Sequence, residues 1–126
     1  MLQRIQTVYL TLAFGLLVLA VAMIVFIHRL PETVASICFS ASALLALTAI
    51  FIYRKRMRQI KIVVLSQVVI LLGCVAIVFV PIIQHTPSNG IGINLCPAII
   101  AFFFEMLARR SIIKDEKLVR SADRIR

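Results

Sequence analysis

Long stretches without a charged residue constrain this chain more than any other feature of its sequence. Asp, Glu, Lys and Arg are absent from residues 5–27, 33–53 and 62–104. About 20 helical residues cross a hydrocarbon core of about 30 Å. The chain is 62% hydrophobic, whereas soluble domains are about 45–50% apolar. Because lipid offers backbone N–H and C=O groups no partner, each stretch is expected to be helical, which predicts an all-α integral membrane protein.

The longest uncharged stretch exceeds what one helix needs. Its segment PIIQHTPSNGIGIN contains four turn or breaker residues, namely Pro81, Pro87, Gly90 and Gly92. It therefore splits into two spans, and Pro97 is expected in the first turn of the second one, where a missing N–H is harmless. The first stretch is too long for a signal peptide and is predicted to be an uncleaved anchor.

The predicted fold is an up-down bundle of four transmembrane helices over residues 1–108, with a basic cytoplasmic tail helix over residues 109–126. The spans are expected at about residues 5–27, 33–53, 62–83 and 91–107.

Charge asymmetry predicts the orientation. Of the 14 Lys and Arg residues, all but Arg29 lie in the N-terminal stub, the loop RKRMRQIK or the tail. Lys and Arg concentrate in cytoplasmic loops, so both termini are expected in the cytoplasm. The net charge of +9 would also suit nucleic acid, but its arrangement in blocks is that of membrane loops, and no nucleic-acid partner is expected. The residues expected to contact anionic inner-leaflet lipid or a partner are Arg54, Lys55, Arg56, Arg58, Lys61, Arg109, Arg110, Lys114, Lys117, Arg120 and Arg124.

Small residues recur at helical spacing on two spans. Small side chains let helix backbones approach closely in lipid. We therefore expect a packing face, used within the chain, against helices of another membrane protein, or both. Its members are Ala35, Cys38, Ser42, Ala46, Ala49, Ala98 and Ala101.

Glu105 is the one carboxylate within a predicted span. An ionisable residue there is costly and is a functional candidate by default. It can ion-pair with Arg109 at i+4, and Thr48, Ser66 and Gln67 are expected at a similar depth. Three interpretations remain open: a structural polar layer, a site that handles protons or cations, and a contact with a partner subunit.

The sequence contains no recognisable catalytic set. Gly-rich phosphate loops, Ser/His/Asp sets, carboxylate pairs and metal-ligand clusters are missing. The protein is therefore expected to be non-enzymatic and to need no cofactor or metal. Cys38, Cys74 and Cys96 are predicted to be free thiols, with a Cys38–Cys96 disulfide as the alternative.

The tail carries an apolar stripe among its charges. Leu118, Ala122 and Ile125 follow an i, i+4, i+7 spacing. A basic amphipathic helix can lie on the anionic inner leaflet. It can also pack against a cytoplasmic partner, or simply fix the topology by its charge.

Both ends of the chain resemble a known family. The start MLQRIQTVYL and the end LARRSIIKDEKLVRSADRIR are similar to domain-of-unknown-function family 4293, which comprises small membrane proteins of Bacteroidota. The end motif is a basic pair followed by KDE, LVRS and DR. The resemblance implies a four-span inner-membrane protein and brings no activity, cofactor or catalytic residue. The function expected is that of an accessory or scaffold subunit of a larger membrane complex, with a small transporter or channel that couples ions or protons through Glu105 as the alternative.

Overall fold

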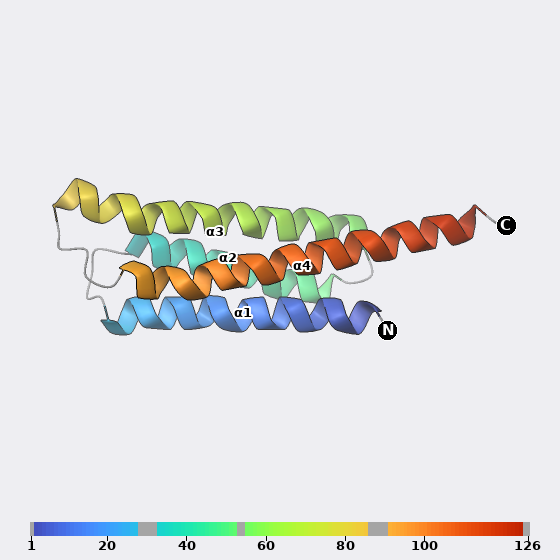
Figure 1. The fold of residues 1–126 in the computed structure, drawn as a ribbon, viewed down its shortest axis with the longest axis horizontal. Coiled ribbons are helices and arrows are strands. Elements are labelled where there is room, and N and C mark those ends of the chain that lie inside the picture. Colours follow the sequence, from blue (N-terminus) through green and yellow to red (C-terminus); the bar gives the residue numbers. More distant parts are fainter. Residues whose placement is uncertain (1, 28–32, 53–54, 86–90, 125–126) are drawn as a thin grey trace.

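Four long helices make up the computed structural model, which describes residues 2–27, 33–52, 55–85 and 91–124. They are α1 (Leu2–Ile27), α2 (Thr33–Phe51), α3 (Arg56–Gln84) and α4 (Ile91–Asp123) (Figure 1). The described residues contain no strand. The predicted all-helical class is confirmed.

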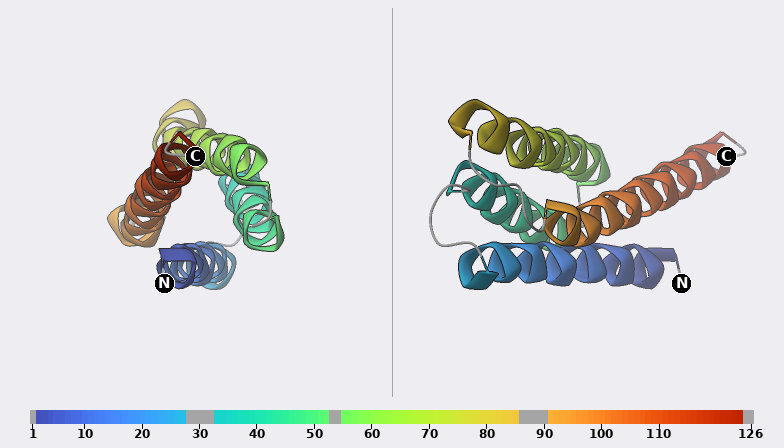
Figure 2. Two further views of the ribbon diagram at one scale, coloured as in Figure 1. Left: turned by 90° about the vertical axis from the view of Figure 1, so that its right-hand side faces the viewer. Right: turned by 60° about the vertical axis from the view of Figure 1, so that its left-hand side comes forward.

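The helices form a four-cornered bundle. Each packs against two neighbours, in the cyclic order α1, α2, α3, α4 and back to α1. Seen end-on, they stand at the corners of a quadrilateral (Figure 2, left). Figure 1 shows that α1 and α3 begin at the end of the molecule where α4 finishes. Short connections between consecutive helices favour this packing of sequence neighbours side by side.

Three helices are long and apolar enough to cross a membrane, namely Arg4–Phe26, Thr33–Phe51 and Arg56–Ile83. Their outward faces carry large apolar side chains, such as Leu44 and Phe51 on α2. An apolar exterior of this kind matches a lipid environment. By the same measure of length and composition, α4 is not among the candidate spans in the described part of the chain.

The basic loop is shorter than predicted, because α3 starts at Arg56 rather than near residue 62. Arg58 and Lys61 therefore stand on the first turns of α3. The amides of Arg58 and Gln59 donate to the carbonyl of Lys55 at 2.9 and 3.0 Å. The segment contains no Gly or Pro and consists largely of good helix formers, which explains the early start. Arg54 lies outside the described residues.

α3 ends within the segment where the sequence predicted a break, but Pro81 does not itself end the helix. Pro81 lies within the helix, which continues to Gln84. The helix ends at His85, whose φ of 50° is left-handed and whose N–H donates to the carbonyl of Pro81. On α4, Gly92 is in the first turn, and Pro97 follows one turn later than predicted. Pro87 and Gly90 lie outside the described residues.

The tail is not a separate helix. α4 runs through the predicted boundary at residues 108 and 109 without interruption for 33 residues, or about 50 Å at the helical rise per residue. No Gly or Pro follows Pro97 in the sequence, so nothing local ends the helix there. Its last turns extend beyond the N-terminus of α1 (Figure 1).

Small residues line the interior, as predicted. Ala35, Ser42, Ala46 and Ala49 of α2 are almost completely buried, as are Ala98 and Ala101 of α4. Cys38 is half-buried, and all three cysteines are free thiols. α2 and α3 approach each other closely at Gly73 of α3, where an added Cβ would stand 2.6 Å from Cε1 of Phe39.

Candidate functional site

A polar layer divides the bundle interior into two apolar clusters. The larger cluster includes Leu17, Phe39, Ile70 and Ala101, and the smaller one comprises Leu10, Ala49, Val63, Ala108 and Ile112. Glu105 lies on α4 between Ala101 and Ala108. Ser66 lies on α3 between Val63 and Ile70. Both side chains are fully buried, so apolar packing separates this layer from both ends of the bundle.

One hydroxyl connects three helices in this layer. Oγ of Ser66 donates to Oε1 of Glu105 at 2.7 Å and lies 3.1 Å from the carbonyl oxygen of Ser42. A serine hydroxyl has a single proton, so these two acceptors compete for it. The shorter contact has the usual length of an O–H···O hydrogen bond. The layer therefore fixes the register of α2, α3 and α4 relative to one another.

The layer retains unused hydrogen-bonding capacity. Oε2 of Glu105 and Nε2 of Gln67 are buried, and neither has a hydrogen-bond partner among the described residues. An unpaired buried polar group costs about 1–3 kcal/mol. One free acceptor and one free donor can bind a water molecule, hold a proton or meet a polar group from another chain.

Two of the residues predicted to join Glu105 lie elsewhere. Thr48 is exposed, and its hydroxyl donates to the carbonyl of Leu45 in its own helix at 2.8 Å. Arg109 is exposed and makes no ion pair with Glu105. Glu105 points into the bundle, whereas a long guanidinium side chain gains more by extending to water or lipid headgroups. The prediction was right for Ser66 and wrong for these two as partners.

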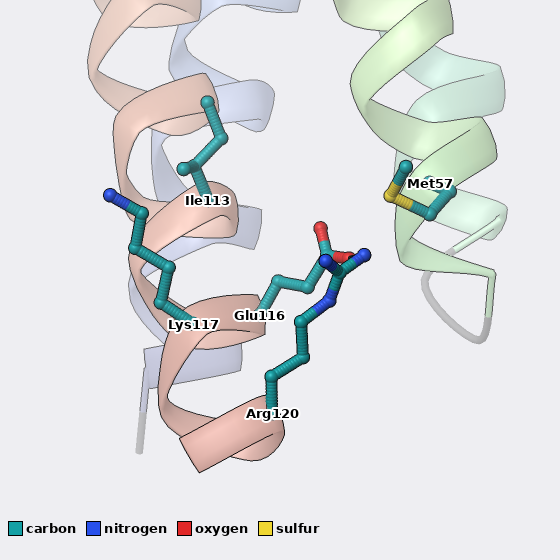
Figure 3. Close-up of a pocket in the computed structure, with 5 residues that line it drawn as sticks. All are labelled: Met57, Ile113, Glu116, Lys117 and Arg120. Atoms are coloured by element: carbon teal, nitrogen blue, oxygen red, sulfur yellow. The ribbon is translucent and has the colours of Figure 1, made fainter.

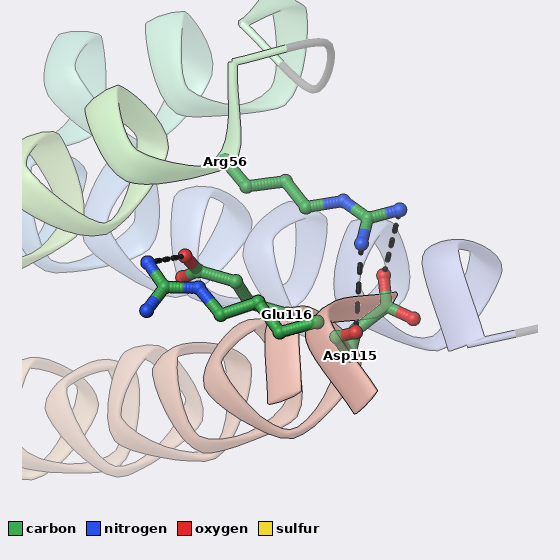
Figure 4. Close-up of polar contacts among 4 residues, drawn as sticks. Arg56, Asp115 and Glu116 are labelled. Atoms are coloured by element: carbon green, nitrogen blue, oxygen red, sulfur yellow. Dashed lines mark hydrogen bonds and ion pairs between the residues drawn. The ribbon is translucent and has the colours of Figure 1, made fainter. Parts of the chain in front are cut away.

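A second polar level closes the bundle beyond the smaller cluster. Nη2 of Arg56 lies 3.3 Å from Oδ2 of Asp115, and Nη1 donates to the backbone carbonyl of Asp115 at 3.5 Å (Figure 4). Gln6 and Gln59 are also buried. Arg56 and Asp115 each lie ten residues from the Ser66–Glu105 pair, on α3 and α4 respectively. The antiparallel register predicts this ion pair once the first pair is known, and that signal was missed.

A small pocket opens between the start of α3 and the end of α4. Its volume is about 280 Å³, and it is lined by Met57, Ile113, Glu116, Lys117 and Arg120 (Figure 3). Nη2 of Arg120 bonds Oε1 of Glu116 at 2.8 Å across one helical turn. Met57 projects from α3 toward the α4 residues (Figure 3). Sequence reasoning did not find this pocket, because its two walls are far apart in the chain.

Most of the predicted basic contact residues are accessible. Arg56 is partly buried by its ion pair. The other described members of the set are exposed, namely Lys55, Arg58, Lys61, Arg109, Arg110, Lys114, Lys117, Arg120 and Arg124. Among the described residues, no three His, Cys, Asp or Glu side chains are grouped in a way that would hold a metal ion.

These features define a helical protein compatible with a membrane, with a buried carboxyl group and a basic end. The family described as "Domain of unknown function (DUF4293)" matches residues 25–125, and the chain belongs to this family. No curated protein and no solved structure gives a significant match.

Proposed function

We propose that this protein is a four-span protein of the bacterial inner membrane, with both termini in the cytoplasm. In this proposal residues 91–107 of α4 form the fourth span. Glu105 is their one charged residue, and their outward face carries exposed Ile99, Ile100 and Phe103. Ring contact between Tyr9 and Phe104, with centroids 6.2 Å apart, supports the packing of this segment alongside α1.

We further propose a non-enzymatic role as an accessory or scaffold subunit of a larger membrane complex. The observation that carries this proposal is the protruding end of α4. Leu118 is 50% exposed and Val119 is 44% exposed. Both lie near the end of α4, whose last turns extend beyond the N-terminus of α1 (Figure 1). A helix continuous with a span points away from the bilayer, so this apolar face is available to protein rather than to acyl chains.

The proposed partner carries an acidic amphipathic segment. Residues 109–126 contain seven Lys and Arg against three Asp and Glu. Opposite charge on the partner steers association and fixes its orientation.

A photo-crosslinking amino acid at Leu118 tests the subunit role in intact cells. A discrete crosslinked protein is expected, with the same crosslinker at Leu44, on the lipid-facing side of α2, as the control. The proposal fails if position 118 gives only lipid adducts or none, or if mild-detergent purification always yields the protein alone.

Cysteine accessibility tests the orientation separately. With Cys38, Cys74 and Cys96 replaced by Ala, single cysteines at Met57 and Leu118 should react from the cytoplasm, and one at His85 from the other side. Labelling of positions 57 and 118 from opposite sides would overturn the four-span topology.

Transport is the second candidate, and the free Oε2 of buried Glu105 favours it. A carboxyl group inside a membrane bundle is a common part of a proton or cation path. Purified protein in liposomes should then conduct, and Glu105→Gln should abolish the flux, whereas Glu116→Gln should retain it. Equal fluxes for Glu105→Gln and the parent protein would exclude Glu105 as the coupling group.

A further inference from the structure

The pocket between α3 and α4 combines an apolar floor with a basic rim. Met57 and Ile113 supply the apolar side chains, and Lys117 and Arg120 supply the cations. Lys117 has no acidic partner among the described residues, whereas Arg120 is held by Glu116. The Arg120 side chain is 70% exposed, so that a stronger anion can reach it.

The register of α3 and α4 places this pocket relative to the membrane. Ser66 meets Glu105 and Arg56 meets Asp115, so Lys61 and Arg110 stand at one level, where the uncharged spans end. At the helical rise, Ile113 and Lys117 lie about 5–11 Å beyond that level. The headgroup region is about 5–8 Å thick on each side of the hydrocarbon core. The pocket therefore lies at headgroup depth, provided that α4 is a span, as proposed above.

The direction of the α4 side chains also favours a position of the pocket at headgroup depth. Cβ atoms point toward the N-terminus of their helix, which for α4 is the direction of the proposed membrane. Arg120 follows this rule and reaches back one turn to Glu116 (Figure 3). Both cations of the rim thus lean toward the bilayer.

We propose that this pocket binds the phosphodiester headgroup of an anionic phospholipid. Lys117 and Arg120 hold the phosphate, with Arg120 exchanging its bond to Glu116 for it, and Met57 and Ile113 contact the glycerol and first methylene groups. Basic pockets at the cytoplasmic ends of transmembrane helices bind anionic lipid headgroups in this way.

The pocket and the proposed partner surface occupy different sides of α4. At about 100° per residue, Leu118 lies about 140° around the helix from Ile113. Loss of lipid binding therefore leaves the crosslink at Leu118 intact, so the two proposals can fail independently.

Native mass spectrometry of the full chain with added lipid tests the proposal. The probes are cardiolipin, phosphatidylglycerol, phosphatidylcholine and inorganic phosphate. Lys117→Ala/Arg120→Ala removes the rim, and Lys114→Ala/Arg124→Ala removes two exposed cations of the same helix outside the pocket. Met57→Trp fills the pocket without changing the charge.

We expect the two anionic lipids to bind in preference to phosphatidylcholine. The rim variant should lose about 10- to 30-fold in affinity, at the usual contribution per basic residue, and the control pair less than about 3-fold. Met57→Trp should also weaken binding.

Three outcomes would overturn the inference. Equal losses of lipid affinity in the rim and control variants would indicate diffuse electrostatic attraction to the basic helix rather than binding in the pocket. Unchanged binding in Met57→Trp would place the lipid elsewhere. Retention of inorganic phosphate without lipid would assign the pocket to a soluble anion.

Discussion

Gly73 is the position where the structure makes the sharpest energetic prediction. An alanine there would place its Cβ 2.6 Å from Cε1 and 2.9 Å from Cδ1 of Phe39, and 3.2 Å from Cβ of Cys38. Carbon atoms in favourable contact are about 3.5–4.0 Å apart. The ring of Phe39 is fully buried, so its displacement would disturb the surrounding core. Gly73→Ala therefore forces α2 and α3 apart.

The expected magnitude follows from two opposing effects. Overpacking a well-packed core costs about 1–3 kcal/mol. Replacing Gly by Ala within a helix recovers about 0.8–1.0 kcal/mol. We expect Gly73→Ala to lower the free energy of unfolding by about 0–2 kcal/mol, and by about 1–3 kcal/mol relative to a glycine-to-alanine change that meets no neighbour. Phe39→Leu in the same chain should recover part of this loss, because it removes the ring atoms that clash.

Two native cysteines provide the assay. Cys38 and Cys74 are half-buried beside the contact, whereas Cys96 is exposed. With Cys96 replaced by Ala, a thiol-reactive dye reports unfolding in mixed micelles as Cys38 and Cys74 become accessible. Gly15 is the control, since an added Cβ there meets nothing within 4 Å, and Gly15→Ala should be neutral or stabilising. Equal stability of Gly73→Ala and Gly15→Ala would refute the close approach of α2 and α3.

Three further predictions use the same unfolding measurement. Ser66→Ala should lower the free energy of unfolding by about 1–3 kcal/mol, because it leaves Glu105 without its hydrogen-bond partner. The double variant Ser66→Ala/Glu105→Leu should lose less stability than Ser66→Ala alone. A larger loss in the double variant would contradict the hydrogen bond. A double-mutant cycle on Arg56 and Asp115 should give about 0.2–1 kcal/mol of coupling, since both side chains retain solvent contact, whereas Arg58 and Asp115 should give none. Ile112→Ala should lower the free energy of unfolding by about 2–5 kcal/mol, because Ile112 is fully buried. Leu118→Ala should leave the stability almost unchanged. Similar losses for both variants would mean that the start of the tail is not part of the bundle.

Sequence patterns predicted the helices better than their ends. The uncharged stretches marked the cores of α1, α2 and α3, because apolar length is what a membrane span requires. Charged residues did not mark the ends of the helices, because helical structure continues through both basic segments. Arg and Lys mark where a helix leaves hydrocarbon, but they are good helix formers and do not end it. Hence α3 begins at Arg56 and α4 continues to Asp123.

The polar layer was predictable in its members but not in its bonds. Periodicity placed Glu105 on the same face as Ala98 and Ala101, and all three are buried. Which hydroxyl reaches the carboxyl group depends on the rotation and register of α3, and periodicity on α4 contains no information about either. Thr48 and Ser66 were equally plausible from depth alone, and only the packed bundle separates the exposed hydroxyl from the buried one.

The continuity of α4 connects the buried layer to the exposed end of the molecule. Glu105, Ala108 and Ile112 follow one buried stripe, and Val119, two turns further on, lies close to the same line. Within the bundle this stripe packs against the neighbouring helices, and beyond the N-terminus of α1 it has no cover within the described structure (Figure 1). From Glu105 to Asp123 the helix contains no Gly or Pro at which it could kink sharply. A partner that binds the protruding turns would therefore act on the same rigid body that positions Glu105 against Ser66, and a lipid bound at Lys117 would act on its opposite side.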